Sequence, residues 1–387
     1  MNKKNVYMDH GATTPVRQEV LEAMLPFFSE LYGNPSSLHA KGRDVRKAFE
    51  EARRVTAASL GVEPDEIYFT SGGTESNNIA LRGAAKKHGS GHIITSSIEH
   101  HAVLDVCKDL EKQGFSVTYL PVDKYGLINM GEFESSIKPE TFLVSIMAAN
   151  NEIGTVQPIS EIGAIAEKHK ILFHTDAVQV VGQMPLNIKE LNLDFLSLSA
   201  HKFNGPKGVG ALYKRKGVKI DPLYHGGGQE RKLRPGTENV PGVIGLSKAL
   251  ELAVGELPQK AEELAKLRNR LIEGLVRIDD VVLNGHPEKR LPGNVNVSFK
   301  YIEGESVLLS LDLHGIAASS GSACSSGSLD PSHVLSAIGL DHQTAHGSIR
   351  FSLGRGNAEE DIDYVLDIIP SIVDRLRQMS PIRKESC

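Results

Sequence analysis

A lysine and an aspartate each follow directly after a short apolar segment of this chain. Lys202 comes shortly after FLSLS (residues 195–199), and Asp176 follows ILFHT (residues 171–175). A lysine held at such a position can attack a carbonyl group as a neutral amine and form a Schiff base, although most loop lysines are solvated charges. A carboxylate there can cap a helix or pair with a protonated ring nitrogen. Such a lysine and acid together are what pyridoxal phosphate requires of a protein.

Two further segments could hold the rest of such a cofactor. Gly72 and Gly73 lie in TSGGTES, between an expected strand and an expected helix. Free backbone N–H groups at the start of a helix favour phosphate, although a simple capped turn explains the same pattern. His100 follows another expected strand, where an imidazole could stack on a cofactor ring and move protons, or serve only the structure.

Cys324 stands alone in ASSGSACSSGS, a run of small residues in which its side chain is expected to be exposed. Because the reference pKa of a thiol is about 8.5, a modest shift would make it a good nucleophile. The alternative is a passive small residue. The other cysteines, Cys107 and Cys387, are not spaced to form a metal or redox pair with it. The odd count excludes a disulfide framework and favours a reducing compartment, so we expect a cytoplasmic protein.

Length and composition favour a soluble protein with one large domain and a smaller companion. The chain has 387 residues, of which 40% are hydrophobic and 24% charged, and its net charge is −5. This charge gives no reason to expect nucleic acid or an anionic membrane as a partner. No apolar run approaches the length of about 18 residues that a membrane span needs, and no secretion signal is visible at the amino terminus.

Short apolar segments alternate with helical patterns through the first two thirds of the chain, which is typical of a mostly parallel sheet covered on both faces. Amphipathic helices are expected over 17–31 and 42–60. Strands are expected at 66–70, 92–96, 116–122, 141–149, 171–175, 195–199 and 209–213, with helices at 101–113 and 159–169. Ligands of such sheets bind at the carboxyl ends of the strands, where Lys202, Asp176 and His100 are found.

A smaller α+β domain is expected to follow. Residues 239–278 are largely helical, 294–299 and 348–353 have the pattern of strands, and 305–313 and 359–377 have that of helices. We therefore predict a large domain over 15–256. Residues 1–14 and 257–387 would form the small domain, which would carry the loop around Cys324.

From end to end, the chain resembles the cysteine desulfurases of the NifS/IscS-like group, within the class-V aminotransferase family. The matching motifs are Gly33-Asn34-Pro35, FTSGGTES (69–76), NNEIG (150–154), SAHK (199–202), SGSAC (320–324) and SIRFSLGR (348–355). The resemblance implies an α/β fold of the aspartate-aminotransferase type (fold type I) and a homodimer with active sites near the subunit boundary. It also implies that L-cysteine is converted to L-alanine while its sulfur is held as a persulfide on Cys324, for delivery to iron–sulfur cluster assembly or another acceptor.

The resemblance also implies a role for individual residues. Lys202 would carry pyridoxal 5'-phosphate, Asp176 would face its ring nitrogen, and His100 would stack on the ring. The other cofactor contacts would come from Gly73, Thr74, Asn151, Gln179, Ser199, His201 and, from the second subunit, Thr237. Asn34, Asn151 and Arg350 would bind the substrate, since a planar two-pronged arginine suits a carboxylate. No resident metal is implied, although Cys324 could ligate an iron–sulfur cluster transiently.

Two departures from the family pattern accompany this resemblance. His10 stands where Tyr or Asn is expected, and few residues follow Ser380, whereas the housekeeping members of the family usually carry a longer tail that helps to dock an iron–sulfur scaffold protein. The nearest alternatives are a selenocysteine lyase and a small-amino-acid transaminase. A non-catalytic scaffold would not need Lys202, Asp176 and His100 together. A nicotinamide oxidoreductase is disfavoured because its glycine pattern is missing.

Overall fold

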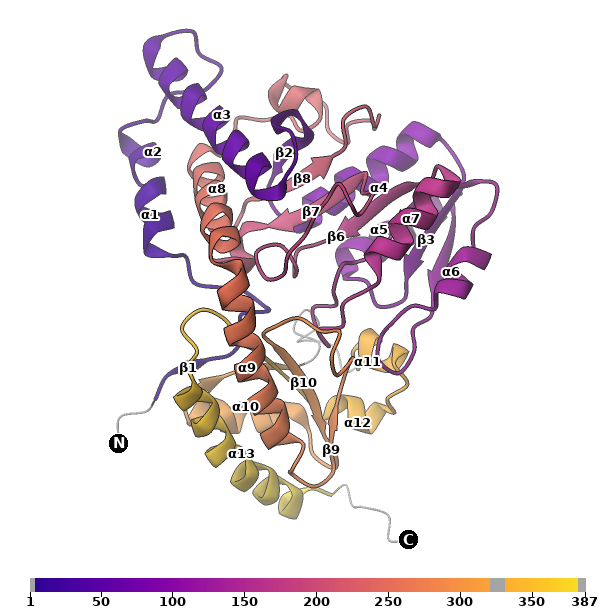
Figure 1. Ribbon diagram of the computed structural model, residues 1–387, viewed down its shortest axis with the longest axis vertical. Coiled ribbons are helices and arrows are strands. Elements are labelled where there is room, and N and C mark those ends of the chain that lie inside the picture. The colour runs from indigo at the N-terminus through magenta and orange to yellow at the C-terminus, as the bar shows by residue number, and fades with distance from the viewer. Residues whose placement is uncertain (1–3, 321–330, 382–387) are drawn as a thin grey trace.

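The computed structural model describes residues 4–320 and 331–381 of the chain (Figure 1). A seven-stranded sheet with the order β2-β8-β7-β6-β5-β3-β4 forms its larger half. The strands are β2 (Ile67–Thr70), β3 (His92–Ser96), β4 (Ser116–Leu120), β5 (Thr141–Ser145), β6 (Leu172–Asp176), β7 (Phe195–Ser199) and β8 (Gly210–Lys214). The expected mostly parallel sheet is thereby confirmed, and only β8 runs antiparallel to its neighbours, β2 and β7. All the other strands of this sheet therefore end at one edge.

Helices cover both faces of this sheet because its strands are apolar on both sides. Ile93 and Phe195 pack in one hydrophobic cluster with residues of α4 (Gly73–His88) and α5 (His101–Lys112). Their neighbours Ile94 and Leu196 point to the other face, where they join a cluster with α3 (Ala40–Leu60), α7 (Ile159–His169) and α8 (Val240–Gly255). Successive residues of a strand alternate between faces, so both faces must be covered when both residues are apolar.

Two helices replace the single helix that was expected over 17–31. They are α1 (Gln18–Met24) and α2 (Pro26–Ser29). Pro26 has no backbone N–H with which to continue α1, and instead it occupies the first position of the new helix. The sequence pattern also missed α6 (Met130–Ser135) and a short 3-10 turn, η1 (Pro64–Glu66).

The smaller half contains a four-stranded antiparallel sheet with the order β12-β13-β10-β9. Its strands are β9 (Val281–Leu283), β10 (Asn294–Phe299), β12 (Ser319–Ser320) and β13 (Ser348–Ser352), and its helices are α9 (Leu257–Leu275), α10 (Gly304–Leu313) and α13 (Glu359–Met379). Figure 1 shows α8 and α9 following one another from the larger half into the smaller one. Two short helices, α11 (His333–Ala337) and α12 (His342–His346), complete this half.

A short parallel pair brings the amino terminus to the smaller half. β1 (Val6–Tyr7) pairs with β11 (Ile316–Ala317), and neither strand was expected. Val6 and Met8 are buried in a cluster whose other members are residues between 264 and 373. The segment that follows β1 is thereby held between the two halves. Among the described residues, no helix combines the length and apolar character that crossing a membrane requires.

Candidate active site

The carboxyl edge of the seven-stranded sheet is hollowed by a cavity of about 380 Å³. Segments that follow β2, β3, β5, β6 and β7 line it, as expected where parallel strands end together. The structure brings the following predicted site residues to its wall: Gly73, Thr74, His100, Asn151, Asp176, Gln179, Ser199, His201, Lys202 and Arg350. Its size lies within the range of about 300–1,000 Å³ that is usual for small-molecule sites.

Asp176, the last residue of β6, is held by two hydrogen bonds. Its Oδ2 accepts from Asn77 Nδ2 at 2.6 Å, and its Oδ1 accepts from the backbone N–H of Val178 at 3.0 Å. The carboxylate therefore stabilises the turn after β6, where no helix follows among the described residues for it to cap, and it also lines the cavity. Asn77 was missed in the sequence. It lies about one helical turn beyond Gly73 in α4 and therefore on the same helix face, which is the signal that could have found it.

Lys202 ends a 3-10 turn, Ala200–Lys202, directly after β7. Its Nζ donates to the carbonyl oxygens of Gly11 at 2.6 Å and Ala12 at 2.9 Å. Gln179 Nε2 donates to the Gly11 carbonyl as well, at 3.1 Å. The segment after β1 thus lies over the lysine. No local pattern in the sequence predicted this long-range contact.

The start of α4 forms a cradle suited to a phosphate group. Gly72 caps the helix and Gly73 begins it, so the first backbone N–H groups of the helix have no partner within it. Gly210 of β8 packs so closely here that an added Cβ would lie 2.5 Å from the Leu198 carbonyl oxygen and 2.7 Å from Gly72 Cα. This tight packing places the cradle beside Ser199, at the end of β7.

His201 borders the same cradle as a neutral donor or acceptor. Burial, together with the neighbouring cations Lys202 and Lys207, lowers its pKa to about 4. Its Nδ1 lies 3.2 Å from Thr13 Oγ1. A neutral imidazole beside a phosphate can hydrogen-bond to it without adding a second charge to that of Lys202.

His100 caps α5 with its own ring. Its Nδ1 accepts from the backbone N–H of Ala102 at 3.0 Å, so a neutral ring carries its proton on Nε2. Burial lowers the pKa of His100, Asp176 opposes this, and Lys202 adds to it. A neutral imidazole ring on the cavity wall is suited to stacking on an aromatic ring.

The residue before His100 in the chain carries a buried carboxyl group. Glu99 is fully buried, and its Oε1 accepts from Ser96 Oγ at 2.7 Å and from the Met147 N–H at 2.8 Å. The second of these bonds takes Met147 out of the strand, so β5 ends at Ser145 and not at residue 149 as expected. Burial raises the pKa of Glu99 to about 8. The group is therefore neutral near pH 7 and adds no charge to the site.

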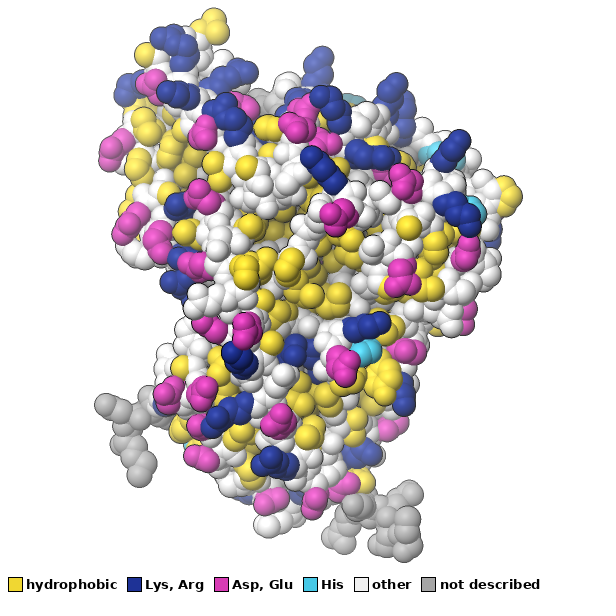
Figure 2. Space-filling view, in the orientation of Figure 1, with side chains coloured by type: hydrophobic (Ala, Val, Ile, Leu, Met, Phe, Trp, Pro, Cys, Tyr) yellow, Lys and Arg dark blue, Asp and Glu magenta, His cyan; other side chains and the backbone are white. Residues whose placement is uncertain are grey.

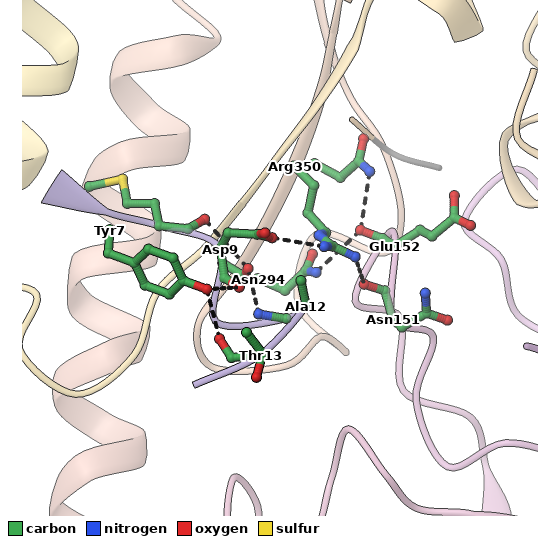
Figure 3. Close-up of polar contacts among 12 residues, drawn as sticks. Tyr7, Asp9, Ala12, Thr13, Asn151, Glu152, Asn294 and Arg350 are labelled. Atoms are coloured by element: carbon green, nitrogen blue, oxygen red, sulfur yellow. Dashed lines mark hydrogen bonds and ion pairs between the residues drawn. The ribbon is translucent and has the colours of Figure 1, made fainter. Parts of the chain in front are cut away.

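Arg350 projects from β13 into the cavity wall, and it is only 1% exposed. Its Nη2 lies 3.0 Å from Asp9 Oδ1, and its Nη1 donates to the Asn151 carbonyl at 3.0 Å (Figure 3). Within the described part of the chain, its Nε has no hydrogen-bond partner. These two acceptors orient the guanidinium and leave several of its N–H groups uncommitted, among them the buried Nε–H, which fits the recognition of a carboxylate. Asp9 was not singled out in the sequence as a partner of Arg350.

Three predicted site residues are not placed at this cavity. Asn34 and Thr237 are exposed and do not line it. Cys324 lies outside the described residues. His10, which departs from the family pattern, packs edge-on against Tyr7 with ring centroids 4.9 Å apart. Its ring fills the space beside Gly354, where a Cβ would come within 2.4 Å of it, so the residue has a packing role.

The cavity fits pyridoxal phosphate on three counts taken from its geometry. Lys202 supplies the amine, Asp176 supplies a fixed carboxylate, and the start of α4 supplies N–H groups for a phosphate. Arg350 adds a cationic donor for a substrate carboxylate. The arrangement can therefore bind an amino acid beside the cofactor and act on its α-carbon.

Comparison with known proteins also points to a pyridoxal-phosphate enzyme. Residues 6–365 match the family described as aminotransferase class-V. The chain is 61% identical to the cysteine desulfurase IscS of Methanosarcina thermophila, covering 98% of this chain and 94% of that one. It is 56% identical to the cysteine desulfurase IscS of Dictyoglomus turgidum, covering 99% and 98%. A solved structure of a NifS-like protein aligns with a TM-score of 0.91 at 45% identity, covering 96% of this chain and all of the other.

Proposed function

We propose that this chain, which belongs to the class-V aminotransferase family and within it to the cysteine desulfurases, converts L-cysteine to L-alanine and keeps the sulfur as a persulfide on Cys324. The cofactor of this family is pyridoxal 5'-phosphate. The relatives' names favour this reaction over the selenocysteine lyase and transaminase alternatives. The observation that carries the proposal is the convergence of Lys202, Asp176 and Arg350 on one cavity.

The residues at the cavity divide the work of the first half-reaction. When bound, pyridoxal phosphate supplies the carbonyl group for amine exchange and an electron sink for the α-carbon. Arg350 would hold the substrate carboxylate with its uncommitted donors. Lys202 Nζ would take the α-proton, and Asp176 would face the ring nitrogen and keep a proton on it. Asn77 and the Val178 N–H fix the direction of that carboxylate.

Cys324 would carry the second half-reaction. Its thiolate would attack the sulfur of the bound cysteine, so that a sulfur–sulfur bond forms as the bond between sulfur and the β-carbon breaks. The electron pair of the broken bond would go to the β-carbon, which then takes a proton, and the organic product leaves as alanine. Cys107 cannot replace Cys324, because it is fully buried and burial raises the pKa of its thiol to about 12.

The same proposal includes a homodimer. Exposed apolar side chains on α1, α2 and the segment that follows them support it, namely Leu21, Leu25, Phe28, Tyr32 and Leu38. Figure 2 shows hydrophobic side chains over this end of the molecule, with charged ones among them. Large apolar patches on a protein surface commonly mark contacts with another chain. In a dimer, the exposed Thr237 would reach the cofactor phosphate of the second subunit, and Asn34 would lie near the substrate.

We also propose how the chain divides into domains, where the protein is located and what accepts its sulfur. Residues 15–256 would form the cofactor-binding domain, and 1–14 with 257–387 the small domain. The shared cluster of Val6, Met8 and residues 264–373 supports this division. The protein would be cytoplasmic, and its partner would be an iron–sulfur scaffold protein or another sulfur acceptor.

Incubation with cysteine and a reductant tests the function directly. Sulfide and alanine should appear in equal amounts, and borohydride should fix the cofactor to the peptide that contains Lys202. Release of alanine without sulfide, or a labelled peptide that contains a different lysine, would contradict the proposal.

A further inference from the structure

Three consecutive residues in the loop between β8 and α8 have a left-handed backbone. The φ angles are 42° at Glu230, 55° at Arg231 and 68° at Lys232. None of the three is glycine, and residues with a Cβ rarely adopt this region, least of all in succession. Such a conformation persists only where the surroundings enforce it, and it concentrates at positions that serve function. The loop also contains Thr237.

A buried ion pair enforces this turn. Glu230 Oε1 lies 2.6 Å from Arg53 Nη2, and Glu230 Oε2 accepts from Arg53 Nη1 at 2.9 Å. Both side chains are 4% exposed. The Arg53 guanidinium lies over the ring of Phe69, 4.9 Å from its centroid. A two-pronged pair of this kind fixes direction as well as distance, so it determines where the Glu230 backbone must lie.

The turn is attached to the elements that form the phosphate cradle of its own subunit. Glu230 Oε2 also accepts from the backbone N–H of Phe69 at 2.8 Å, in the strand that leads into Gly72 and Gly73. Further along the loop, Arg234 Nε donates to Glu75 Oε1 at 3.1 Å, and Glu75 is the residue after Thr74. Two independent contacts therefore tie the loop to strand β2 and to the first turn of α4.

The loop is also braced across its own width. Gln229 Oε1 accepts from the Gly236 N–H at 3.0 Å, which closes the loop immediately before Thr237. The position of Thr237 thus follows from the position of Gln229, and that of Gln229 from the adjoining turn at Glu230. We propose that Glu230, held by Arg53, is a positioning residue for the cofactor phosphate, and that it acts by presenting Thr237 to the site of the second subunit. This inference rests on the proposed function, which includes the homodimer.

Phosphate-selective cofactor binding provides the test. The affinity of the cofactor-free protein should be measured by absorbance titration with pyridoxal phosphate and, separately, with pyridoxal, which forms the same bond to Lys202 but has no phosphate. Glu230→Gln should weaken binding of pyridoxal phosphate about ten-fold or more, because an amide cannot accept both prongs of Arg53. Binding of pyridoxal should stay unchanged. Arg53→Lys keeps the charge but loses the fork, so it should show a smaller loss of the same kind.

Asp194→Asn is a matched control. Asp194 is also buried, accepts from a strand N–H (Phe173, 2.9 Å) and pairs with an arginine (Arg215, 2.6 Å), but it has no contact with the cradle. It should affect the two ligands equally. Equal losses for both ligands in Glu230→Gln and Arg53→Lys would overturn the proposal, because they would indicate general damage to the fold.

Combination with Thr237→Ala identifies the route of the effect. If Glu230 acts through Thr237, the double variant should bind pyridoxal phosphate no more weakly than the single variant that binds it less tightly. Additive losses in the double variant would overturn the proposal. If Thr237→Ala weakens phosphate binding and neither Glu230→Gln nor Arg53→Lys does, the positioning role alone is wrong. If Thr237→Ala has no effect, the shared site of the proposed function is itself wrong, and the positioning role falls with it.

Discussion

Replacing Arg350 with lysine should separate substrate recognition from cofactor binding. Arg350 is buried between Asp9 and Asn151, and its Nε is left without a partner among the described residues. The guanidinium has more N–H donors than these two acceptors use. It can therefore offer a substrate carboxylate a pair of parallel hydrogen bonds while keeping both protein contacts. A lysine ammonium has fewer donors and no fixed fork.

The size of the effect follows from the number of bonds lost. With Asp9 and the Asn151 carbonyl still to satisfy, an ammonium can give the substrate carboxylate one bond where Arg350 gives two. A hydrogen bond to a charged group contributes about 1.5–3 kcal/mol. We therefore expect kcat/KM for cysteine to fall about 10- to 150-fold, since about 1.4 kcal/mol corresponds to a factor of ten. The affinity for pyridoxal phosphate should not change, because Arg350 faces the substrate.

The assay is alanine formation over a range of cysteine concentrations, together with titration of the cofactor. Arg268→Lys is the control for loss of a buried arginine, because Arg268 is 8% exposed and, among the described residues, donates to Asn269, Arg290 and Leu291, none of which lines the cavity. It should lower the melting temperature and leave kcat/KM nearly unchanged. If Arg350→Lys keeps kcat/KM within a factor of about two, the carboxylate is bound elsewhere and the reasoning is refuted.

Three further predictions concern single groups. Asp176→Asn should keep the cofactor but lose most exchange of the substrate α-proton with solvent, measured by NMR in deuterated water; full exchange would contradict its assigned role. Cys324→Ser should still bind cysteine but form no persulfide and almost no alanine, whereas Cys107→Ser should keep most activity because that thiol is buried. Burial raises the pKa of Glu99 from 4.5 to about 8, so the folded state holds a proton that the unfolded state releases, and this contribution to stability is lost as the pH rises from 4.5 to 8. Glu99→Gln cannot lose that proton, so its melting temperature relative to the unchanged protein should rise between about pH 5 and about pH 8, and a constant difference would argue against the raised pKa.

The seven-stranded sheet could be predicted because its strands are apolar runs bounded by turns. Lys202, Asp176 and His100 could be found for the same reason, since each lies at or shortly after a strand end, and parallel strands bring their ends together. The reversed direction of β8 was not evident, because an apolar pattern does not encode strand direction.

What escaped the sequence depends on contacts between distant residues. β1 and β11 have two residues each, too few for any periodic pattern, so their pairing could not be expected. The partners of Arg350 were missed for a related reason: Asp9 lies 341 positions away along the chain. The boundary between the predicted domains stays a prediction, and so do the roles of all the site residues, those of Asn34, Thr237 and Cys324 included.

The pairing of β1 with β11 affects the order in which the protein can assemble during translation. The amino terminus emerges from the ribosome first. The whole seven-stranded sheet lies within residues 67–214, which emerge before β10, β11 and β13 have been made. Val6 and Met8 must wait for those later residues, because their hydrophobic cluster is otherwise formed by 264–373. Gly11 and Ala12, which lie over Lys202, follow them directly in the chain. A nascent chain should therefore complete its sheet early and cover its reactive lysine only near the end of synthesis.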